Sequence, residues 1–135
     1  MEDQELLRYS KQIMLPQIDV EGQQKIMYST VLIIGMGGLG SPTALYLAAA
    51  GIGHIIIADF DQVELSNLQR QIIHQTKDIG EDKVDSAKNK LTELNPNIKV
   101  TIANELIHTD NLSTLIKDVD IVLDGTDNFE SRFEI

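Results

Sequence analysis

Four glycines in one short loop are the first residues whose spacing points to chemistry. Residues 35–40 read Gly-Met-Gly-Gly-Leu-Gly, so the glycines are Gly35, Gly37, Gly38 and Gly40. The loop follows a β-branched run and opens a segment of small apolar residues, the setting in which G-x-G-x-x-G binds phosphate through backbone N–H groups. It predicts a nucleotide-binding site without choosing between nucleotides. The alternative is a tight turn that binds no ligand.

Two carboxylates, Asp59 and Asp61, follow the next β-branched run. An acidic residue at the end of the second strand of a dinucleotide-binding fold ordinarily accepts hydrogen bonds from ribose hydroxyls. The spacing from the glycine loop therefore predicts that Asp59 binds ribose, a role that suits ATP and NAD equally. Asp61 extends the same acidic turn. The alternative is a solvated carboxylate at the end of a strand.

Two cations further along the chain have a possible use with phosphates. Arg70 lies in Ser-Asn-Leu-Gln-Arg-Gln, residues 66–71, a sequence that an ordinary dinucleotide-binding fold does not require. Its guanidinium could clamp a polyphosphate with two hydrogen bonds, although spacing alone favours an arginine at the surface. Lys83 lies at the start of a predicted helix, where acidic residues are usual. Spacing leaves an anionic partner and a merely solvated lysine equally open.

Asp127 follows the last predicted strand, in the sequence Asp-Gly-Thr-Asp-Asn at residues 124–128. Its carboxylate could hold Mg²⁺ against phosphate oxygens, or it could cap the next helix, and the two roles are compatible. The histidines His54, His74 and His108 show no metal-ligand spacing. We therefore predict that they are structural or solvated.

The residues around these motifs predict an α/β fold of the Rossmann-like, doubly wound type with a mainly parallel sheet. Two short helices, at 3–13 and 19–27, are expected to precede the core. Apolar and β-branched runs predict strands at 30–34, 54–58, 98–102 and 119–123, and helical periodicity predicts helices at 39–50, 81–94 and 110–116, the last capped by Asp110.

Topology brings the predicted motifs together. Right-handed crossovers give such a sheet the strand order 3-2-1-4, and its first and fourth strands meet at the topological switch point. The glycine loop, the acidic turn and the turn that contains Asp127 each follow a strand, so we expect all three at one edge of the sheet. Because no repeat or linker divides the chain, residues 1–135 are predicted to form one nucleotide-binding domain.

Composition excludes several classes of function. The 11 Lys and Arg against 21 Asp and Glu give a net charge of −10, which disfavours general nucleic-acid binding. Residues 31–57 carry no charge, but glycines and Pro42 divide them into strand, helix and strand, so we expect no membrane span. No apolar secretory signal begins the chain, which predicts a cytoplasmic location. With no cysteine, we expect no zinc–thiolate site within these residues.

Six motifs, taken in order, resemble the bacterial sulfur-carrier adenylyltransferases. These are the molybdopterin-synthase and thiamine-biosynthesis activating enzymes, relatives of the ubiquitin-activating enzymes. The motifs are Arg-Tyr-Ser-Lys-Gln-Ile at 8–13, the glycine loop, Asp-Phe-Asp at 59–61, Ser-Asn-Leu-Gln-Arg-Gln at 66–71, the segment 80–83 and Asp-Gly-Thr-Asp-Asn at 124–128. The resemblance runs from about Leu7 to the end of the chain.

The resemblance implies a nucleotide, a reaction and a partner. It implies that Asp59 binds the ribose of ATP and that Arg70 and Lys83 contact the phosphates. Asn67 then assists these cations, and Asp127 serves Mg²⁺. The implied reaction is acyl-adenylate formation, in which the C-terminal glycine carboxylate of a ubiquitin-like sulfur-carrier protein attacks the α-phosphate of ATP and pyrophosphate leaves. It also implies a homodimer.

The chain departs from the family pattern at two places. Lys11 stands where the family has an arginine that reaches the ATP of the neighbouring subunit, and lysine keeps the charge but loses the bidentate fork. We therefore expect reduced activity from this contact. The chain ends at Ile135, where family members continue with further strands and a carrier-binding surface. A fragment of a longer enzyme, or a form unable to complete the reaction, is expected.

Two other classes of function stay open. The glycine loop and Asp59 would serve an NAD-dependent oxidoreductase domain equally well, although that class leaves Arg70 and Asp127 unexplained. A non-catalytic nucleotide-binding or dimerisation module is compatible with the short chain. Preference for ATP over NAD would separate adenylation from redox chemistry, and turnover of the carrier would separate an enzyme from a module.

Overall fold

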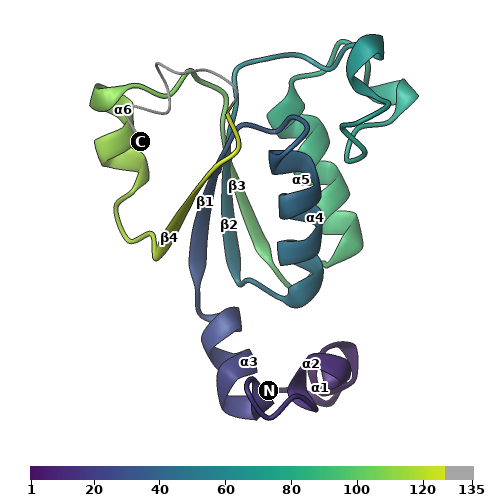
Figure 1. The fold of residues 1–135 in the computed structure, drawn as a ribbon, viewed down its shortest axis with the longest axis vertical. Coiled ribbons are helices and arrows are strands. Elements are labelled where there is room, and N and C mark those ends of the chain that lie inside the picture. The colour runs from purple at the N-terminus through teal and green to yellow at the C-terminus, as the bar shows by residue number, and fades with distance from the viewer. Residues whose placement is uncertain (127–135) are drawn as a thin grey trace.

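A sheet of four parallel strands forms the centre of the computed structural model, which describes residues 1–126 (Figure 1). The strands are β1 (Thr30–Ile34), β2 (His54–Ala58), β3 (Lys99–Ala103) and β4 (Ile121–Asp124). Their order is β3-β2-β1-β4, and each neighbouring pair is parallel. The predicted strand order and the predicted Rossmann-like α/β class are therefore confirmed.

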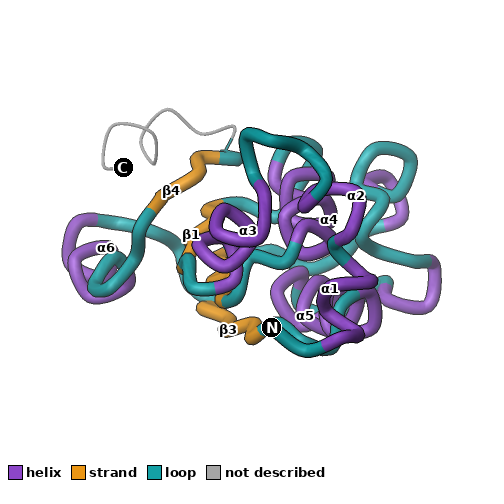
Figure 2. Tube along the Cα trace, turned by 90° about the horizontal axis from the view of Figure 1, so that it is seen from below, coloured by secondary structure: helices purple, strands orange, loops and turns teal. Residues whose placement is uncertain are grey.

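Helices cover both faces of this sheet. The helices α4 (Gly40–Ala50) and α5 (Lys83–Leu94) lie on one face, and α6 (Thr109–Leu115) lies on the other (Figures 1 and 2). Alternate residues of a strand point to opposite faces. Val31 and Ile33 of β1 accordingly belong to the core under α4 and α5, whereas Leu32 and Ile34 belong to the core under α6. Burial on both faces explains the apolar run from Val31 to Ile34 in β1.

Three short helices precede the sheet, rather than the two that the sequence predicts. They are α1 (Asp3–Arg8), α2 (Ser10–Ile13) and α3 (Asp19–Met27), and they lie beyond the amino ends of the strands (Figure 1). The predicted helix at 3–13 is interrupted at Tyr9, whose side chain is buried. The Tyr9 hydroxyl accepts a hydrogen bond from Asn95 Nδ2 at 2.8 Å, so a tertiary contact breaks the helix in two.

The ends of other elements also differ from the predictions. Asp110 lies in the first turn of α6, and the residue at the N-cap is His108, so the predicted cap is wrong. The His108 N–H is satisfied by Asn111 Oδ1 at 2.8 Å. The fourth strand begins at Ile121 rather than two residues earlier, because Asp118 has φ 65° and the chain is still turning there.

The segment between β2 and α5 is long and mostly irregular. It contains two short 3-10 helices, η1 (Leu65–Asn67) and η2 (Thr76–Asp78). Helix α5 begins at Lys83, two residues later than predicted, with Asp82 at its N-cap. Among residues 1–126, no helix is long and apolar enough to span a membrane.

Candidate nucleotide-binding site

A cleft lies at the carboxyl edge of the sheet, where β1 and β4 are neighbours. Its volume is about 140 Å³, and it is lined by the last residues of β1 and β2, by residues that follow all four strands, and by the first residue of α5. The lining residues are Ile34, Gly35, Ala58, Asp59, Phe60, Asp61, Lys83, Glu105, Leu106, Ile107, Gly125 and Thr126. The glycine loop and the acidic turn thus meet at one edge of the sheet, as the topology predicts.

Close backbone packing explains two of the four loop glycines. Gly35 leaves β1 with φ 92°, and a Cβ on it would lie 2.9 Å from the carbonyl carbon of Gly125. A Cβ on Gly40 would lie 1.7 Å from the carbonyl oxygen of Gly35, so no side chain fits there. The loop is therefore folded tightly against the turn after β4.

The other two loop glycines face the segment that contains Arg70. A Cβ on Gly38 would lie 3.7 Å from Arg70 Cδ, and a Cβ on Gly37 would lie 3.3 Å from Gln71 Nε2. The structure therefore places Arg70 beside the loop, although its side chain is exposed. Its contact with phosphates stays a prediction.

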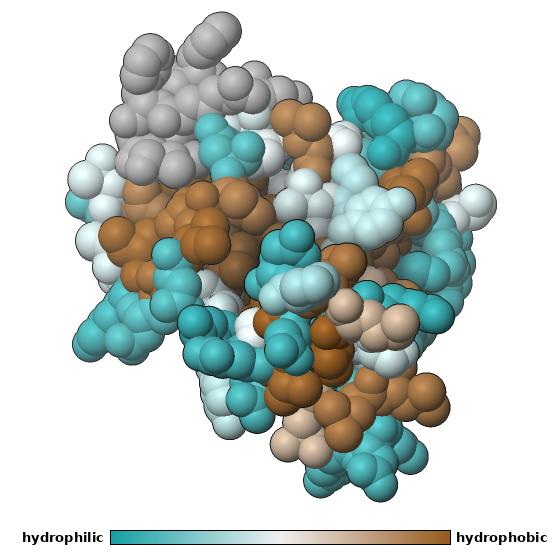
Figure 3. Space-filling view, turned by 60° about the horizontal axis from the view of Figure 1, so that its bottom comes forward, coloured by the Kyte–Doolittle hydropathy of each residue, from teal (hydrophilic) through white to brown (hydrophobic). Residues whose placement is uncertain are grey.

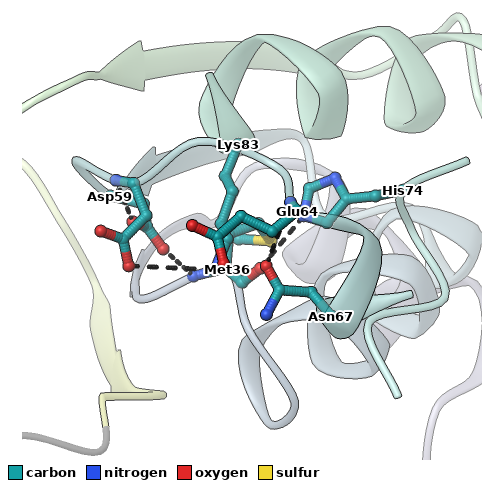
Figure 4. Close-up of polar contacts among 7 residues, drawn as sticks. Met36, Asp59, Glu64, Asn67, His74 and Lys83 are labelled. Atoms are coloured by element: carbon teal, nitrogen blue, oxygen red, sulfur yellow. Dashed lines mark hydrogen bonds and ion pairs between the residues drawn. The ribbon is translucent and has the colours of Figure 1, made fainter. Parts of the chain in front are cut away.

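Asn67 makes a local contact in this structure. Its Oδ1 accepts a hydrogen bond from the Glu64 N–H at 3.2 Å, which closes the first turn of η1 (Figure 4). Asn67 is not among the residues that line the cleft. The predicted assistance to phosphate binding would therefore require its amide N–H₂ group to act from beside the cleft.

Asp59 ties the glycine loop to the acidic turn. Its Oδ2 accepts a hydrogen bond from the Met36 N–H at 2.7 Å, and its Oδ1 accepts one from the Asp61 N–H at 2.9 Å (Figure 4). A carboxylate can accept about four hydrogen bonds in total. Asp59 can therefore hold the loop and still accept hydrogen bonds from a ribose.

Lys83 is buried at the base of the cleft, so the solvated alternative is wrong. Its backbone N–H donates to the carbonyl oxygen of Asp61 at 2.9 Å, and its Nζ lies 3.9 Å from Asp61 Oδ2. Burying an ammonium group is costly unless an anion lies close to it. The cleft therefore contains a cation that one half-exposed carboxylate partly compensates, which favours an anionic ligand.

One predicted site residue, Lys11, lies away from this edge of the sheet. Lys11 is exposed on α2, which lies at the end of the sheet opposite the glycine loop (Figure 1). Asp127 lies outside the described residues. Within residues 1–126, no group of three or more His, Asp or Glu side chains is arranged to hold a metal ion.

Sequence reasoning missed the apolar wall of the cleft. Phe60, between the two aspartates, is half exposed, and Leu106 and Ile107 follow β3 at the same edge. Their positions in the sequence could have indicated them, because residues just after a parallel strand lie at the ligand-binding edge of the sheet. The cleft thus has an apolar side as well as the charged side formed by Asp59 and Lys83.

His74 is a buried structural residue, which agrees with the prediction. Its ring is hydrogen-bonded at both nitrogens, to Ser86 Oγ at 2.7 Å and to the Met36 carbonyl oxygen at 3.2 Å. Burial lowers the pKa of His74, the nearby Lys83 charge lowers it further, and the hydrogen bond to Met36 opposes the shift. The folded protein therefore favours the neutral ring.

This environment predicts a pH dependence of stability. As the pH falls below about 6.5, the ordinary pKa of histidine, the unfolded chain gains a proton that folded His74 resists, so the free energy of unfolding falls. The loss ends once the pH is below the lowered pKa of folded His74. Urea unfolding at about pH 7.5 and about pH 5.5 measures the difference.

The matched variant is His74→Gln, which is expected to show a smaller difference between the two pH values. His54, whose pKa burial also lowers, contributes with the same sign in both proteins and cancels in the comparison. An equal loss of stability in the variant would contradict the assignment to His74.

The fold and the position of the cleft are those of Rossmann-like domains, which bind nucleotides at this switch point. The ThiF family model matches residues 9–135, and the chain belongs to the ThiF family. The predicted family resemblance is therefore confirmed.

Two curated relatives from Escherichia coli (strain K12) match over 135 residues, the whole of this chain. The sulfur carrier protein ThiS adenylyltransferase is 49% identical, and the molybdopterin-synthase adenylyltransferase is 47% identical. The chain covers 54% of each, so it spans about half the length of these relatives.

A solved structure supports the fold. It is the E. coli tRNA N6-threonylcarbamoyladenosine dehydratase, TcdA, in complex with ATP. It superposes with a TM-score of 0.91 at 26% identity, over 97% of this chain and 54% of that chain.

Proposed function

We propose that this chain is the nucleotide-binding part of an adenylyltransferase that activates the C-terminal glycine of a ubiquitin-like sulfur-carrier protein with ATP. One observation carries the proposal: the buried Lys83 lines the same cleft as Asp59 and Gly35, the first glycine of the loop. The names of the two adenylyltransferase relatives support the class of reaction.

The lining of the cleft suggests how ATP lies in it. The adenine ring is proposed to lie against Phe60 and Leu106, the apolar side, and the ribose to bind Asp59. The phosphates then extend toward the glycine loop, with Lys83 and Arg70 on them. In this arrangement the apolar lining residues serve the base, Asp59 the sugar, and the cations and loop N–H groups the phosphates.

The proposed reaction needs no general base. A C-terminal carboxylate is already ionised at neutral pH, so it can attack the α-phosphate directly, with pyrophosphate as the leaving group. The protein then has to position the reactants and stabilise phosphate charge. Lys83, Arg70 and the N–H groups of the glycine loop are the groups that do so. Mg²⁺, proposed to be held by Asp127 and the phosphates, would neutralise further charge.

A homodimer is part of the proposal. Leu7, Met14 and Leu15, on and beside α1 and α2, are large apolar side chains left exposed. Figure 3 brings this end of the molecule forward and shows apolar surface there. In a dimer, Lys11 on the same helices would reach the ATP of the neighbouring subunit.

The single domain over residues 1–135 and the cytoplasmic location also stay predictions.

The proposal is tested by calorimetric titration of this chain with Mg-ATP and, separately, with NAD. We expect Mg-ATP to bind and NAD not to bind. Arg70→Ala is expected to raise the Kd for Mg-ATP by about 10- to 100-fold, because charge-assisted hydrogen bonds contribute about 1.5–3 kcal/mol. Chelation of Mg²⁺ is expected to weaken ATP binding as well.

Lys99→Ala is the matched control, since Lys99 is an exposed cation at the amino end of β3, away from the cleft. NAD binding in place of ATP would support the oxidoreductase alternative instead. If neither nucleotide binds, these residues do not form the site by themselves. ATP binding without pyrophosphate release in the presence of a carrier would favour a non-catalytic module.

A further inference from the structure

His74 connects two parts of the proposed site that are far apart in the sequence. The residue is 4% exposed, and it lies just after the segment that contains Arg70. One ring nitrogen, Nε2, lies 3.2 Å from the carbonyl oxygen of Met36 in the glycine loop. The other, Nδ1, lies 2.7 Å from Ser86 Oγ in α5. The ring therefore bridges the loop and the helix.

The chemistry of the partners defines the direction of both hydrogen bonds. A carbonyl oxygen can only accept, so Nε2 of His74 carries the hydrogen and donates to Met36. In the neutral ring Nδ1 then carries none, and it accepts from the Ser86 hydroxyl. Both nitrogens are thus satisfied by one tautomer, and the bridge has a single hydrogen-bonded form.

Each end of the bridge is attached to a group of the proposed site. Met36 is held on both sides, because its N–H donates to Asp59 at 2.7 Å while its carbonyl oxygen accepts from His74. Ser86 follows Lys83 by three residues in α5, so the two lie on the same face of the helix, and both are buried. The positions of Asp59, Met36, His74 and Lys83 can be followed in Figure 4.

We propose that His74 is a positioning residue, which holds the glycine loop in register with Lys83 through Met36 and Ser86. A second hydrogen bond supports the same segment, since the Ile73 N–H donates to Ser41 Oγ, in the first turn of α4, at 3.2 Å. The expected effect on ATP binding rests on the proposed function, whereas the connection between the glycine loop and α5 through His74 does not.

The link between the loop and α5 is tested by amide hydrogen exchange in Ser86→Ala, which removes a hydroxyl of α5 that does not line the cleft. We expect the Met36 amide, protected by Asp59, to exchange about tenfold faster than in the wild type. Thr92→Ala is the matched control, because the Thr92 hydroxyl lies on the same helix and donates to the Lys88 carbonyl oxygen of that helix. It should leave Met36 exchange unchanged.

Two further variants separate the ends of the bridge. His74→Gln can still donate to Met36 from its longer side-chain amide but has no nitrogen at the Nδ1 position to accept from Ser86, so its Met36 exchange should match that of Ser86→Ala. His74→Asn is too short to reach Met36, and its Met36 amide should exchange faster still. Faster exchange at Ile56 in the centre of the sheet would report global destabilisation instead of a local link. Unchanged Met36 exchange in Ser86→Ala, or a general increase that includes Ile56, would overturn the proposal.

The consequence for ligand binding is tested by a double-mutant cycle. Ser86→Ala is expected to raise the Kd for Mg-ATP about tenfold in the wild type and to have little effect in Lys83→Met, because the two residues then act through the same contact. Additive effects would overturn the link to Lys83. If Met36 exchange accelerates but the wild type binds no ATP, the positioning role stands and the proposed function fails.

Discussion

Alanine at Gly40 is expected to destabilise the fold by about 3 kcal/mol or more and to abolish nucleotide binding. The new Cβ would lie 1.7 Å from the carbonyl oxygen of Gly35 and 2.8 Å from its carbonyl carbon. Neither atom belongs to a side chain that can rotate away. Relief would require Gly35 to move, and Gly35 is itself packed against the backbone of Gly125.

Urea unfolding of three glycine variants measures this effect. Gly38→Ala is the matched control within the same loop, since its Cβ would meet Arg70 Cδ at an ordinary 3.7 Å, and a change within about 0.5 kcal/mol is expected. Gly80→Ala should be intermediate, at about 1 kcal/mol, because Gly80 has φ 92° but open space around it. Equal stability of the Gly40 and Gly38 variants would contradict the packing argument.

The sheet was predictable because its strands carry their own signals. The bounds of β1 and β2 match the prediction, since each β-branched run ends at a residue that leaves the strand, Gly35 or Asp59. The break at Tyr9 had no such local signal. It depends on Asn95, 86 residues away, and on Gly51, where a Cβ would lie 2.6 Å from Cζ of the tyrosine ring.

Part of the candidate site could likewise be predicted from the sequence, and part could not. Topology alone brings the glycine loop and Asp59 together, because residues that follow parallel strands share one edge. The burial of Lys83 and the bridge through His74 depend on the path of residues 60–82, which has no regular periodicity to read. For the same reason the sequence did not decide whether Arg70 is a surface residue or binds phosphate. The structure shows it beside the glycine loop and exposed.

Lys83→Met is expected to weaken Mg-ATP binding by about 10- to 100-fold without lowering the free energy of unfolding. Methionine keeps the length of the apolar stem but removes the ammonium group, and a charged hydrogen bond to phosphate contributes about 1.5–3 kcal/mol. Calorimetric titration with Mg-ATP measures the loss of affinity. Lys88→Met, an exposed position on the same helix, is the control.

The free energy of unfolding should not fall in Lys83→Met, because the ion pair between Lys83 and Asp61 contributes little to stability. The Lys83 side chain is 8% exposed, whereas that of its partner Asp61 is 55% exposed, and the two charged atoms are 3.9 Å apart. A pair of this kind contributes about 0–1 kcal/mol after solvent screening, while burial of the ammonium opposes folding. Removing the charge is therefore neutral or stabilising in urea unfolding.

The two measurements together distinguish a ligand-binding lysine from a structural one. When a residue serves ligand binding and opposes folding, its substitution lowers the affinity for the ligand, and the stability of the protein is unchanged or higher. Unchanged affinity would show that Lys83 does not contact the nucleotide. A stability loss of more than about 1 kcal/mol would show instead that the pair with Asp61 holds the acidic turn to α5, and that the buried charge serves the fold.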